Sequence, residues 1–191
     1  MSKRFGIDID GTVTCPTSLI PHINEAFDRR LSLDDLTEYD LTKALPDISP
    51  EVFSQWFLKA EPSIYSSSPV VQYADEILEQ WRSDHELFFI SARSDKHIDL
   101  TMNWFLEKKI GYDHIELIGS HDKVKTAQKF NVDIFFEDKH DNAVMIHEEC
   151  AIPVILFDTP YNRSPIPDGV IRVNNWLDAK KWVNNWILKT T

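Results

Sequence analysis

Two aspartates near the start of the chain are its most chemically suggestive residues. Asp8 and Asp10 end a short apolar run, and Gly11 and Thr12 follow them directly. If the run is a strand, both carboxylates lie on one face and project from its C-terminal end, because side chains alternate along an extended backbone. Gly11 can adopt a positive φ and let the backbone approach an anion, and Thr12 can cap the following segment. This pattern is typical of a phosphoryl-transfer site.

Further polar and charged side chains stand where later apolar runs end. Ser91 and Arg93 follow the second run, Glu137 and Asp138 follow the fourth, and Lys123 begins the helix predicted before the fourth. In a doubly wound sheet, ligands bind beyond the carboxyl ends of the strands, where the strand order reverses. We therefore expect these groups to meet the two N-terminal aspartates at that edge.

The elements that must position these groups alternate along most of the chain. Apolar runs typical of buried strands are separated by segments with a helical period. This alternation predicts a doubly wound α/β fold, with a parallel sheet covered on both faces. The expected strands are 4–9, 87–90, 114–118, 132–136 and 153–157, with an edge strand at 170–173, and the helices between and after them are 95–109, 122–130, 141–150 and 176–188.

The segment between the first two strands has no clear strand pattern and predicts a helical insertion. A helical period begins at Ile20, and Ser49 with Pro50 has the form of a cap followed by a first-turn proline. A second pair of this kind, Ser68 and Pro69, predicts the start of the next helix, which runs to about residue 81.

Composition restricts the partners of the chain. Its 191 residues include 20 basic and 31 acidic ones, and the net charge of −11 argues against DNA or RNA as the main partner. A small phosphorylated substrate is compatible, since a metal ion and one or two lysines can meet its charge locally. No apolar stretch approaches the ~20 residues of a membrane span and no signal-peptide core follows the N-terminus, so we expect a cytoplasmic enzyme. Cys15 and Cys150 are expected to be free thiols, and the oligomeric state is left open.

Together, these residues resemble the four motifs of the haloacid dehalogenase superfamily of aspartate-based phosphatases. The first motif of that superfamily, DxDx[TV], matches the run from Asp8 to Thr12. Ser91, Lys123 and the acidic pair 137–138 match the other three motifs in the superfamily's order. The resemblance implies a Rossmannoid α/β core.

Within that superfamily, the chain is most similar to the 5'(3')-deoxyribonucleotidase family and its bacterial nucleotidases. The similarity lies in the short helical insertion, in Ser-Ala-Arg after the second strand, in Phe-Phe-Glu-Asp after the fourth and in Pro-Tyr-Asn-Arg after the fifth. Vertebrate members have two aspartates in the fourth motif, whereas here the first is Glu137. The resemblance implies a Mg²⁺-dependent nucleotidase acting on (deoxy)nucleoside monophosphates, with a phosphatase of another small metabolite, such as a sugar phosphate, as the alternative.

The same resemblance implies catalytic roles. Asp8 attacks phosphorus and forms an aspartyl-phosphate, while Asp10 protonates the leaving group and later takes a proton from water. Ser91 hydrogen-bonds a phosphoryl oxygen, and a lysine balances the charge of the phosphoryl group. Lys123 is favoured for that role over Lys125 because it stands at the helix start.

Metal and phosphate ligands follow from the resemblance as well. Asp8, the backbone carbonyl of Asp10 and Asp138 are the expected ligands of Mg²⁺, with Glu137 orienting the lysine or an outer-shell water. Two further residues are expected to shape the phosphate's seat, namely Gly11 and Thr12.

Arg93 has two open interpretations. Its guanidinium either grips phosphate with two hydrogen bonds or pairs with Asp95 on the surface.

The insertion is expected to form a cap, residues 15–70, over a core made of 1–14 and 71–191. Superfamily members with a helical cap use it to cover the site, exclude water and contact the leaving group. Its aromatic side chains either stack on a flat base or form the cap's own small core, which their helical spacing favours. They are Phe27, Tyr39, Phe53, Trp56, Phe57 and Tyr65.

Other interpretations fit less well. A phospho-accepting receiver module places its acceptor at the third strand and lacks a large insertion, and a catalytically silent phosphate-binding regulator would not need competent groups in all four motifs. Dehalogenase activity does not need the acid/base at Asp10. We expect His140 and His147 to be surface histidines and not ligands of a transition metal, because such a site needs three or four convergent ligands.

Overall fold

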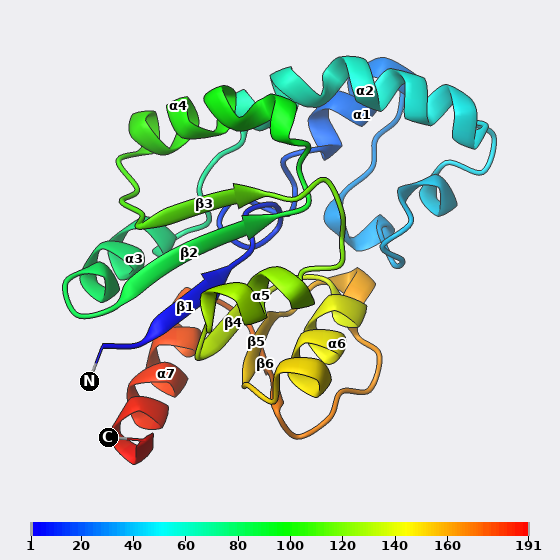
Figure 1. Ribbon diagram of the computed structural model, residues 1–191. Coiled ribbons are helices and arrows are strands. Elements are labelled where there is room, and N and C mark those ends of the chain that lie inside the picture. The colour runs from blue at the N-terminus through cyan, green and yellow to red at the C-terminus, as the bar shows by residue number, and fades with distance from the viewer. Residues whose placement is uncertain (1, 191) are drawn as a thin grey trace.

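The computed structural model of the chain describes residues 2–190, which contain a six-stranded sheet with parallel pairing throughout. The strand order is β3-β2-β1-β4-β5-β6, so the succession of strands reverses at β1 (Figure 1). The predicted doubly wound α/β fold is confirmed. The strands are β1 Arg4–Ile7, β2 Glu86–Ser91, β3 His114–Leu117, β4 Ile134–Glu137, β5 Val154–Phe157 and β6 Val170–Val173.

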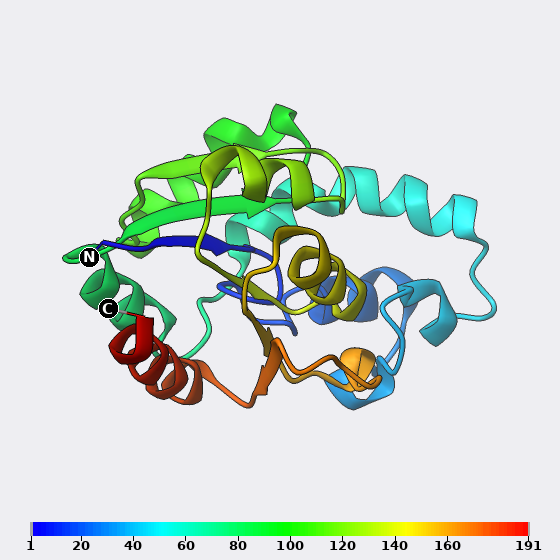
Figure 2. The ribbon, with the colours of Figure 1, turned by 60° about the horizontal axis from the view of Figure 1, so that its bottom comes forward.

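Helices cover both faces of the sheet (Figures 1 and 2). On one face α3, α4 and α7 pack around an apolar cluster with Phe89 and Phe136, and on the other α5 and α6 pack against Phe135. Adjacent residues of β4 thus serve opposite faces. None of the helices in residues 2–190 is long and apolar enough to cross a membrane. Their bounds are α3 Ala74–Arg82, α4 Ile98–Lys108, α5 Val124–Phe130, α6 His140–Cys150 and α7 Trp176–Thr190.

The first strand is shorter than predicted and ends at Ile7. Asp8 still donates its amide to a carbonyl of β4, but the chain then turns back, and two later amides donate to the carbonyl of Ile9. Gly11 lies in this turn with a φ of 78°. Asp10 therefore lies on the turn, and the prediction that both carboxylates project from one face of a strand was wrong.

The insertion between β1 and α3 is helical, as predicted, and lies beyond the carboxyl ends of the strands (Figure 1). The Ser49 side chain accepts a hydrogen bond from the amide of Val52 at 3.3 Å, so the predicted cap is confirmed. The elements of the insertion are α1 Ile20–Phe27, α2 Pro50–Ser67 and short 3-10 helices at Leu33–Asp35 and Leu41–Ala44.

Both ends of the insertion meet in a short pairing of extended backbone, which we call the neck. Thr14 and Val70 form an antiparallel bridge, and the amide of Cys15 donates to the carbonyl of Pro69 at 2.9 Å. The neck holds the insertion beside the turn that carries Asp10.

The predicted helix start at Ser68 and Pro69 was wrong. Helix α3 begins only at Ala74, because the neck draws residues 69–71 into an extended conformation. Ser68 instead closes α2, since its hydroxyl donates to the carbonyl of Ile64 at 2.8 Å.

Candidate active site

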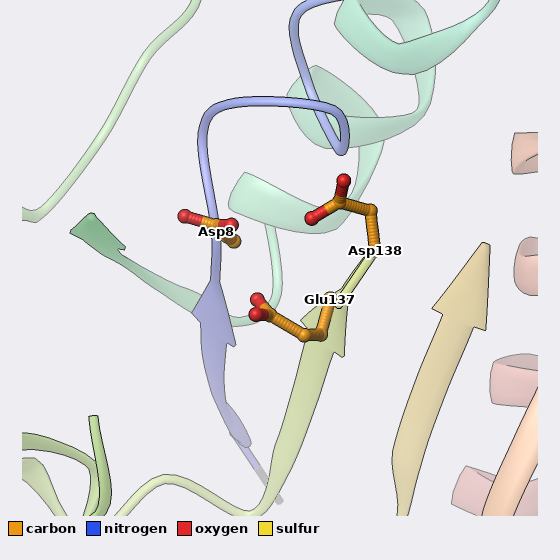
Figure 3. Close-up of side chains that lie close together, drawn as sticks. All are labelled: Asp8, Glu137 and Asp138. Carbon is orange, nitrogen blue, oxygen red and sulfur yellow. The ribbon is translucent and has the colours of Figure 1, made fainter. Parts of the chain in front are cut away.

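The carboxyl edge of the sheet brings the predicted site residues together. Asp8 follows β1, Ser91 ends β2, Glu137 ends β4 and Lys123 immediately precedes α5. Figure 3 shows the carboxylates of Asp8, Glu137 and Asp138 turned toward one another. Because all strands run in parallel, residues far apart in the sequence reach this one edge.

Lys123 is the cation of the cluster. Its side chain is 1% exposed, and its Nζ lies 2.7 Å from Oδ1 of Asp8 and 2.9 Å from Oε2 of Glu137. Burial alone lowers the pKa of Lys123, but the two carboxylates outweigh this effect and raise it. Lys125, the competitor, is exposed. The geometry therefore brings Lys123 and not Lys125 to the site.

Both carboxylate oxygens of Glu137 are engaged by protein groups. Oε2 faces the lysine, and Oε1 accepts a hydrogen bond from Nδ2 of Asn142 at 2.6 Å. Burial, and then the charge of Asp8, raise the pKa of Glu137 well above its usual value. Glu137 is thus placed to orient Lys123.

Asp138 has one oxygen available for a ligand. Its Oδ2 accepts a hydrogen bond from the phenol of Tyr161 at 2.6 Å, whereas the buried Oδ1 has no hydrogen-bond partner within residues 2–190. Burial, and then the charge of Asp8, raise the pKa of Asp138 to about 7.

A divalent cation fits this group of acids. Carboxylate oxygens of Asp8, Glu137 and Asp138 lie within 4.8 Å of one another. One lysine cannot neutralise three buried carboxylates, and the unsatisfied oxygen of Asp138 is aimed at no protein donor that the structure describes. Hard cations such as Mg²⁺ prefer such oxygen ligands.

Two residues of the Pro-Tyr-Asn-Arg segment, to which the sequence analysis gave no role in the site, hold Asp138 in place. Tyr161 donates to its carboxylate, and Nδ2 of Asn162 donates to its backbone carbonyl at 2.7 Å. Both lie in the turn after β5, at the same edge of the sheet. That position was the available signal, since polar residues after a parallel strand face the ligand edge.

The turn after Asp8 is shaped by its glycine. Gly11 has a positive φ, and a Cβ there would lie 2.1 Å from Oδ2 of Asp138, so both conformation and space require glycine. Thr12 is buried, and its hydroxyl has no hydrogen-bond partner in the described part of the chain. Its predicted capping role was wrong, because the next helix begins only at Ile20.

Arg93 has a partner that the sequence did not suggest. Its fully buried guanidinium donates to both oxygens of Asp10, at 2.8 and 2.7 Å, and to Oγ1 of Thr101 at 3.1 Å. The predicted alternative of a surface pair with Asp95 was wrong, because packing buries the side chain toward the site. Its amide also donates to Oγ of Ser91 at 3.2 Å.

A cavity of about 480 Å³ lies between the acids and the insertion. Its aromatic lining from the insertion consists of Tyr39, Phe53, Phe57 and Tyr65. Phe27 and Trp56 pack against Phe53, with ring centroids 6.2 and 5.3 Å apart. The six aromatic residues therefore divide between a cavity wall and a small core, and Phe53 belongs to both.

The histidines also separate into two groups. His121 lines the cavity, with its ring 5.6 Å from that of Tyr39. His140 and His147 each hydrogen-bond a backbone carbonyl at 2.8 Å, at separate positions in the chain.

Residues 4–188 match the model of a family described as 5' nucleotidase, deoxy (pyrimidine), cytosolic type C protein. A protein named "putative nucleotidase" from Halalkalibacterium halodurans is 49% identical over 188 residues, which cover 98% of this chain and 96% of that protein. Another of that name, from Bacillus subtilis, is 47% identical and covers 95% of this chain and 94% of its own. A nucleotidase from Clostridium acetobutylicum is 32% identical over 89% of this chain and 88% of that protein.

Solved structures show the same fold at low sequence identity. A haloacid dehalogenase-like hydrolase from Streptococcus pneumoniae superposes with a TM-score of 0.66 at 12% identity, over 97% of this chain and 98% of that one. A hydrolase of that class from Bacillus subtilis, solved with bound magnesium, has a TM-score of 0.64 at 8% identity, over 96% and 99% of the two chains. The fold is therefore that of haloacid dehalogenase-like hydrolases, and the chain belongs to the cytosolic type C 5'-nucleotidase family and is a phosphatase.

Proposed function

We propose that this enzyme hydrolyses (deoxy)nucleoside monophosphates through an aspartyl-phosphate on Asp8, with Mg²⁺ as cofactor. The observation that carries the proposal is the buried cluster in which Lys123 pairs with Asp8 and Glu137. The names of the relatives support the substrate class, and the family's description as cytosolic supports a cytoplasmic location.

The metal ligands would come from two strand ends. Asp8, Asp138 and the backbone carbonyl of Asp10 would hold Mg²⁺, and Glu137 would remain in the outer shell because the protein engages both of its oxygens. When bound, the ion would neutralise the negative charge of both the phosphoryl oxygens and the buried carboxylates. The magnesium-bound structural relative supports this choice of metal.

Asp8 is oriented for attack by donors on one of its oxygens. The amide of Ile9 donates to Oδ1 at 2.8 Å, and Nζ of Lys123 lies 2.7 Å from the same atom. We therefore assign the attack on phosphorus to Oδ2. As its bond to phosphorus forms, the ester bond breaks and the alcohol leaves.

Asp10 handles the proton in both halves of the reaction. It gives a proton to the leaving oxygen as the ester bond breaks. A water molecule then attacks the aspartyl-phosphate, loses a proton to Asp10, and releases inorganic phosphate and the free Asp8 carboxylate. The proton is thus returned, and no further reactant is needed.

The remaining motif residues would hold the phosphoryl group. The Ser91 hydroxyl would donate to a phosphoryl oxygen, because its oxygen already accepts from the amide of Arg93. Lys123 would balance the negative charge, and the turn at Gly11 and Thr12 would form the seat beneath it.

Residues 15–70 would serve as the cap over the core, which comprises 1–14 and 71–191. The supporting observations are the neck at both ends of this segment and the cavity that it shares with the acids. A cavity of about 480 Å³ with aromatic walls suits a nucleoside as leaving group.

The experiment is a measurement of inorganic phosphate released from deoxyribonucleotides, ribonucleotides, sugar phosphates and phosphoserine, with Mg²⁺ and with EDTA. We expect metal-dependent release that is fastest from nucleoside monophosphates. No metal-dependent release from any substrate would overturn the proposal. Faster release from sugar phosphates would overturn the nucleotide preference and leave the mechanism intact.

A further inference from the structure

The carboxylate of Asp10 is held by a residue outside its own turn. Strand β1 ends before Asp10, and the Asp10 side chain is 43% exposed. Close by in the chain, Oγ1 of Thr14 donates to its Oδ1 at the long distance of 3.5 Å. Arg93 donates to its Oδ2 from Nε at 2.8 Å and to its Oδ1 from Nη2 at 2.7 Å. Two parallel bonds from a planar guanidinium fix the orientation of a carboxylate as well as its position.

Arg93 is itself immobilised from two sides. Its Cζ lies 4.0 Å from the centroid of the Tyr65 ring, which belongs to α2 of the insertion. On the other side, Nη1 donates to Oγ1 of Thr101 in α4 of the core, at 3.1 Å. A desolvated guanidinium over an aromatic face is a favourable contact, so the insertion and the core together seat this side chain.

Tyr65 is tied to the core by a second set of polar contacts. Its phenol donates to Oε1 of Glu61 at 3.3 Å. Oε2 of Glu61 lies 3.0 Å from Nζ of Lys96 and 3.1 Å from Nε2 of His97, both just before α4. The last turns of α2 are therefore fastened where Tyr65 covers the guanidinium.

We propose that Arg93 is a positioning residue that holds Asp10 for proton transfer to the leaving group, and that Tyr65 makes this position depend on the insertion. The inference rests on the proposed function, in which the Asp10 proton passes to the ester oxygen as its bond to phosphorus breaks. In this proposal Arg93 does not bind phosphate directly. The two roles can be distinguished because they have different kinetic consequences.

The test compares kcat/KM for phenyl phosphate and p-nitrophenyl phosphate, which have leaving groups of similar shape. Nitrophenolate is a good leaving group without a proton, whereas phenolate depends more on protonation by Asp10. The ratio kcat/KM reports the steps up to phosphoryl transfer to Asp8. We expect Arg93→Lys to lower kcat/KM for phenyl phosphate by about 10- to 100-fold and for the nitro compound by less than about threefold. Inhibition by inorganic phosphate should stay unchanged.

A direct phosphate contact gives the opposite pattern. Equal losses for both substrates, with weaker inhibition by inorganic phosphate, would overturn the positioning role of Arg93. Retained activity on p-nitrophenyl phosphate shows that a variant is folded, and Thr101→Val supplies a milder variant with the same expected selectivity. The matched control is Arg29→Lys, in a surface pair with Asp47 within the insertion, which should change neither value.

The role of the insertion has its own variant. Tyr65→Leu removes the ring face. We expect kcat/KM for phenyl phosphate to fall by about threefold to tenfold, and kcat/KM for p-nitrophenyl phosphate to fall less. Equal effects on both substrates would overturn the dependence on the insertion.

Asp10→Asn separates this inference from the proposed function. If Asp10→Asn shows no leaving-group selectivity, the acid is misassigned; if it does and Arg93→Lys does not, only the inference fails.

Discussion

The two walls of the cavity differ in how their side chains are held. On the core wall, Asp8, Arg93 and Asp138 are at most 6% exposed and are held by charges and short hydrogen bonds. On the insertion wall, Phe53 and Phe57 are half-buried and meet their neighbours mainly through ring contacts. Loss of one partner on the core wall leaves a buried charge unpaired, whereas an aromatic wall can readjust. The charged side chains of the core wall are therefore more rigidly placed than Phe53 and Phe57 on the insertion wall.

The largest expected effect is on the core wall. Asp8→Asn removes the proposed nucleophile, and we expect kcat to fall by roughly 10⁴-fold or more. Phosphate release measures it, and Asp168→Asn, at an exposed position in the loop before β6, is the control. Retained turnover would mean that another residue is the nucleophile and that the core wall does not carry the chemistry through Asp8.

Removal of the metal should come next. EDTA is expected to lower kcat by more than about 100-fold, because several kcal/mol of charge stabilisation are lost. Readdition of Mg²⁺ should restore activity, and the assay is again phosphate release. Activity that is insensitive to EDTA would contradict the assignment of the acids to a metal.

The metal's effect on stability should depend on pH. Because the pKa of Asp138 is raised to about 7, the folded apoprotein binds more protons than the unfolded chain between about pH 4 and pH 7. Its free energy of unfolding therefore falls as the pH rises through this window. Mg²⁺ needs the ionised carboxylate and offsets that loss, so its effect on Tm should be larger at about pH 8 than at about pH 5.5. An equal shift at both values would argue against Asp138 as a ligand.

A smaller effect is expected from the support of the core wall. Tyr161→Phe removes the phenol that holds Oδ2 of Asp138, and the affinity for Mg²⁺ should fall by about 10- to 100-fold. Titration calorimetry with Mg²⁺ measures this directly, without relying on activity. Tyr112→Phe, whose ring packs on Phe105 in the core, is the matched control. Unchanged affinity would show that Asp138 needs no such support.

The insertion wall should respond through binding. Phe53→Ala removes one aromatic face of the cavity, and we expect KM for a nucleoside monophosphate to rise by about 2- to 10-fold with little change in kcat. Leu58→Ala, at an exposed position of the same helix, is the control. A loss confined to kcat would instead connect this ring to the chemistry.

The smallest effect concerns the stability of the insertion alone. Ser49→Ala removes the side-chain cap of α2 and should cost about 1 kcal/mol, or about 2–4 °C in Tm, with kcat unchanged. Thermal unfolding measures the change, and Ser54→Ala, exposed within α2, is the control. An unchanged Tm would mean that α2 is held by tertiary contacts and does not need its cap.

Sequence patterns predicted the parallel sheet and the gathering of Asp8, Ser91, Lys123 and Asp138, because buried strands and their carboxyl ends follow simple periodic rules. They failed at Asp10 and at Ser68, where local patterns suggested a strand and a cap. At Ser68 the neck decides the conformation, and its two sides are distant in the sequence. At Asp10 the chain turns back instead, because the amides of Val13 and Thr14 donate to the carbonyl of Ile9. The roles of Tyr161 and Thr101 were not predicted, because they depend on single side-chain contacts between elements.

The sequence by itself thus determined the class of chemistry, since two aspartates, a glycine and a threonine in one short run have few other uses. It also determined the order of the elements that bring Lys123 and Asp138 to them. Only the tertiary structure decided which partner Arg93 takes and which aromatic residues face the cavity. Hydrophobic and charge patterns specify which face of an element is buried, whereas the pairing of one guanidinium with one carboxylate depends on how two separately folded elements pack together.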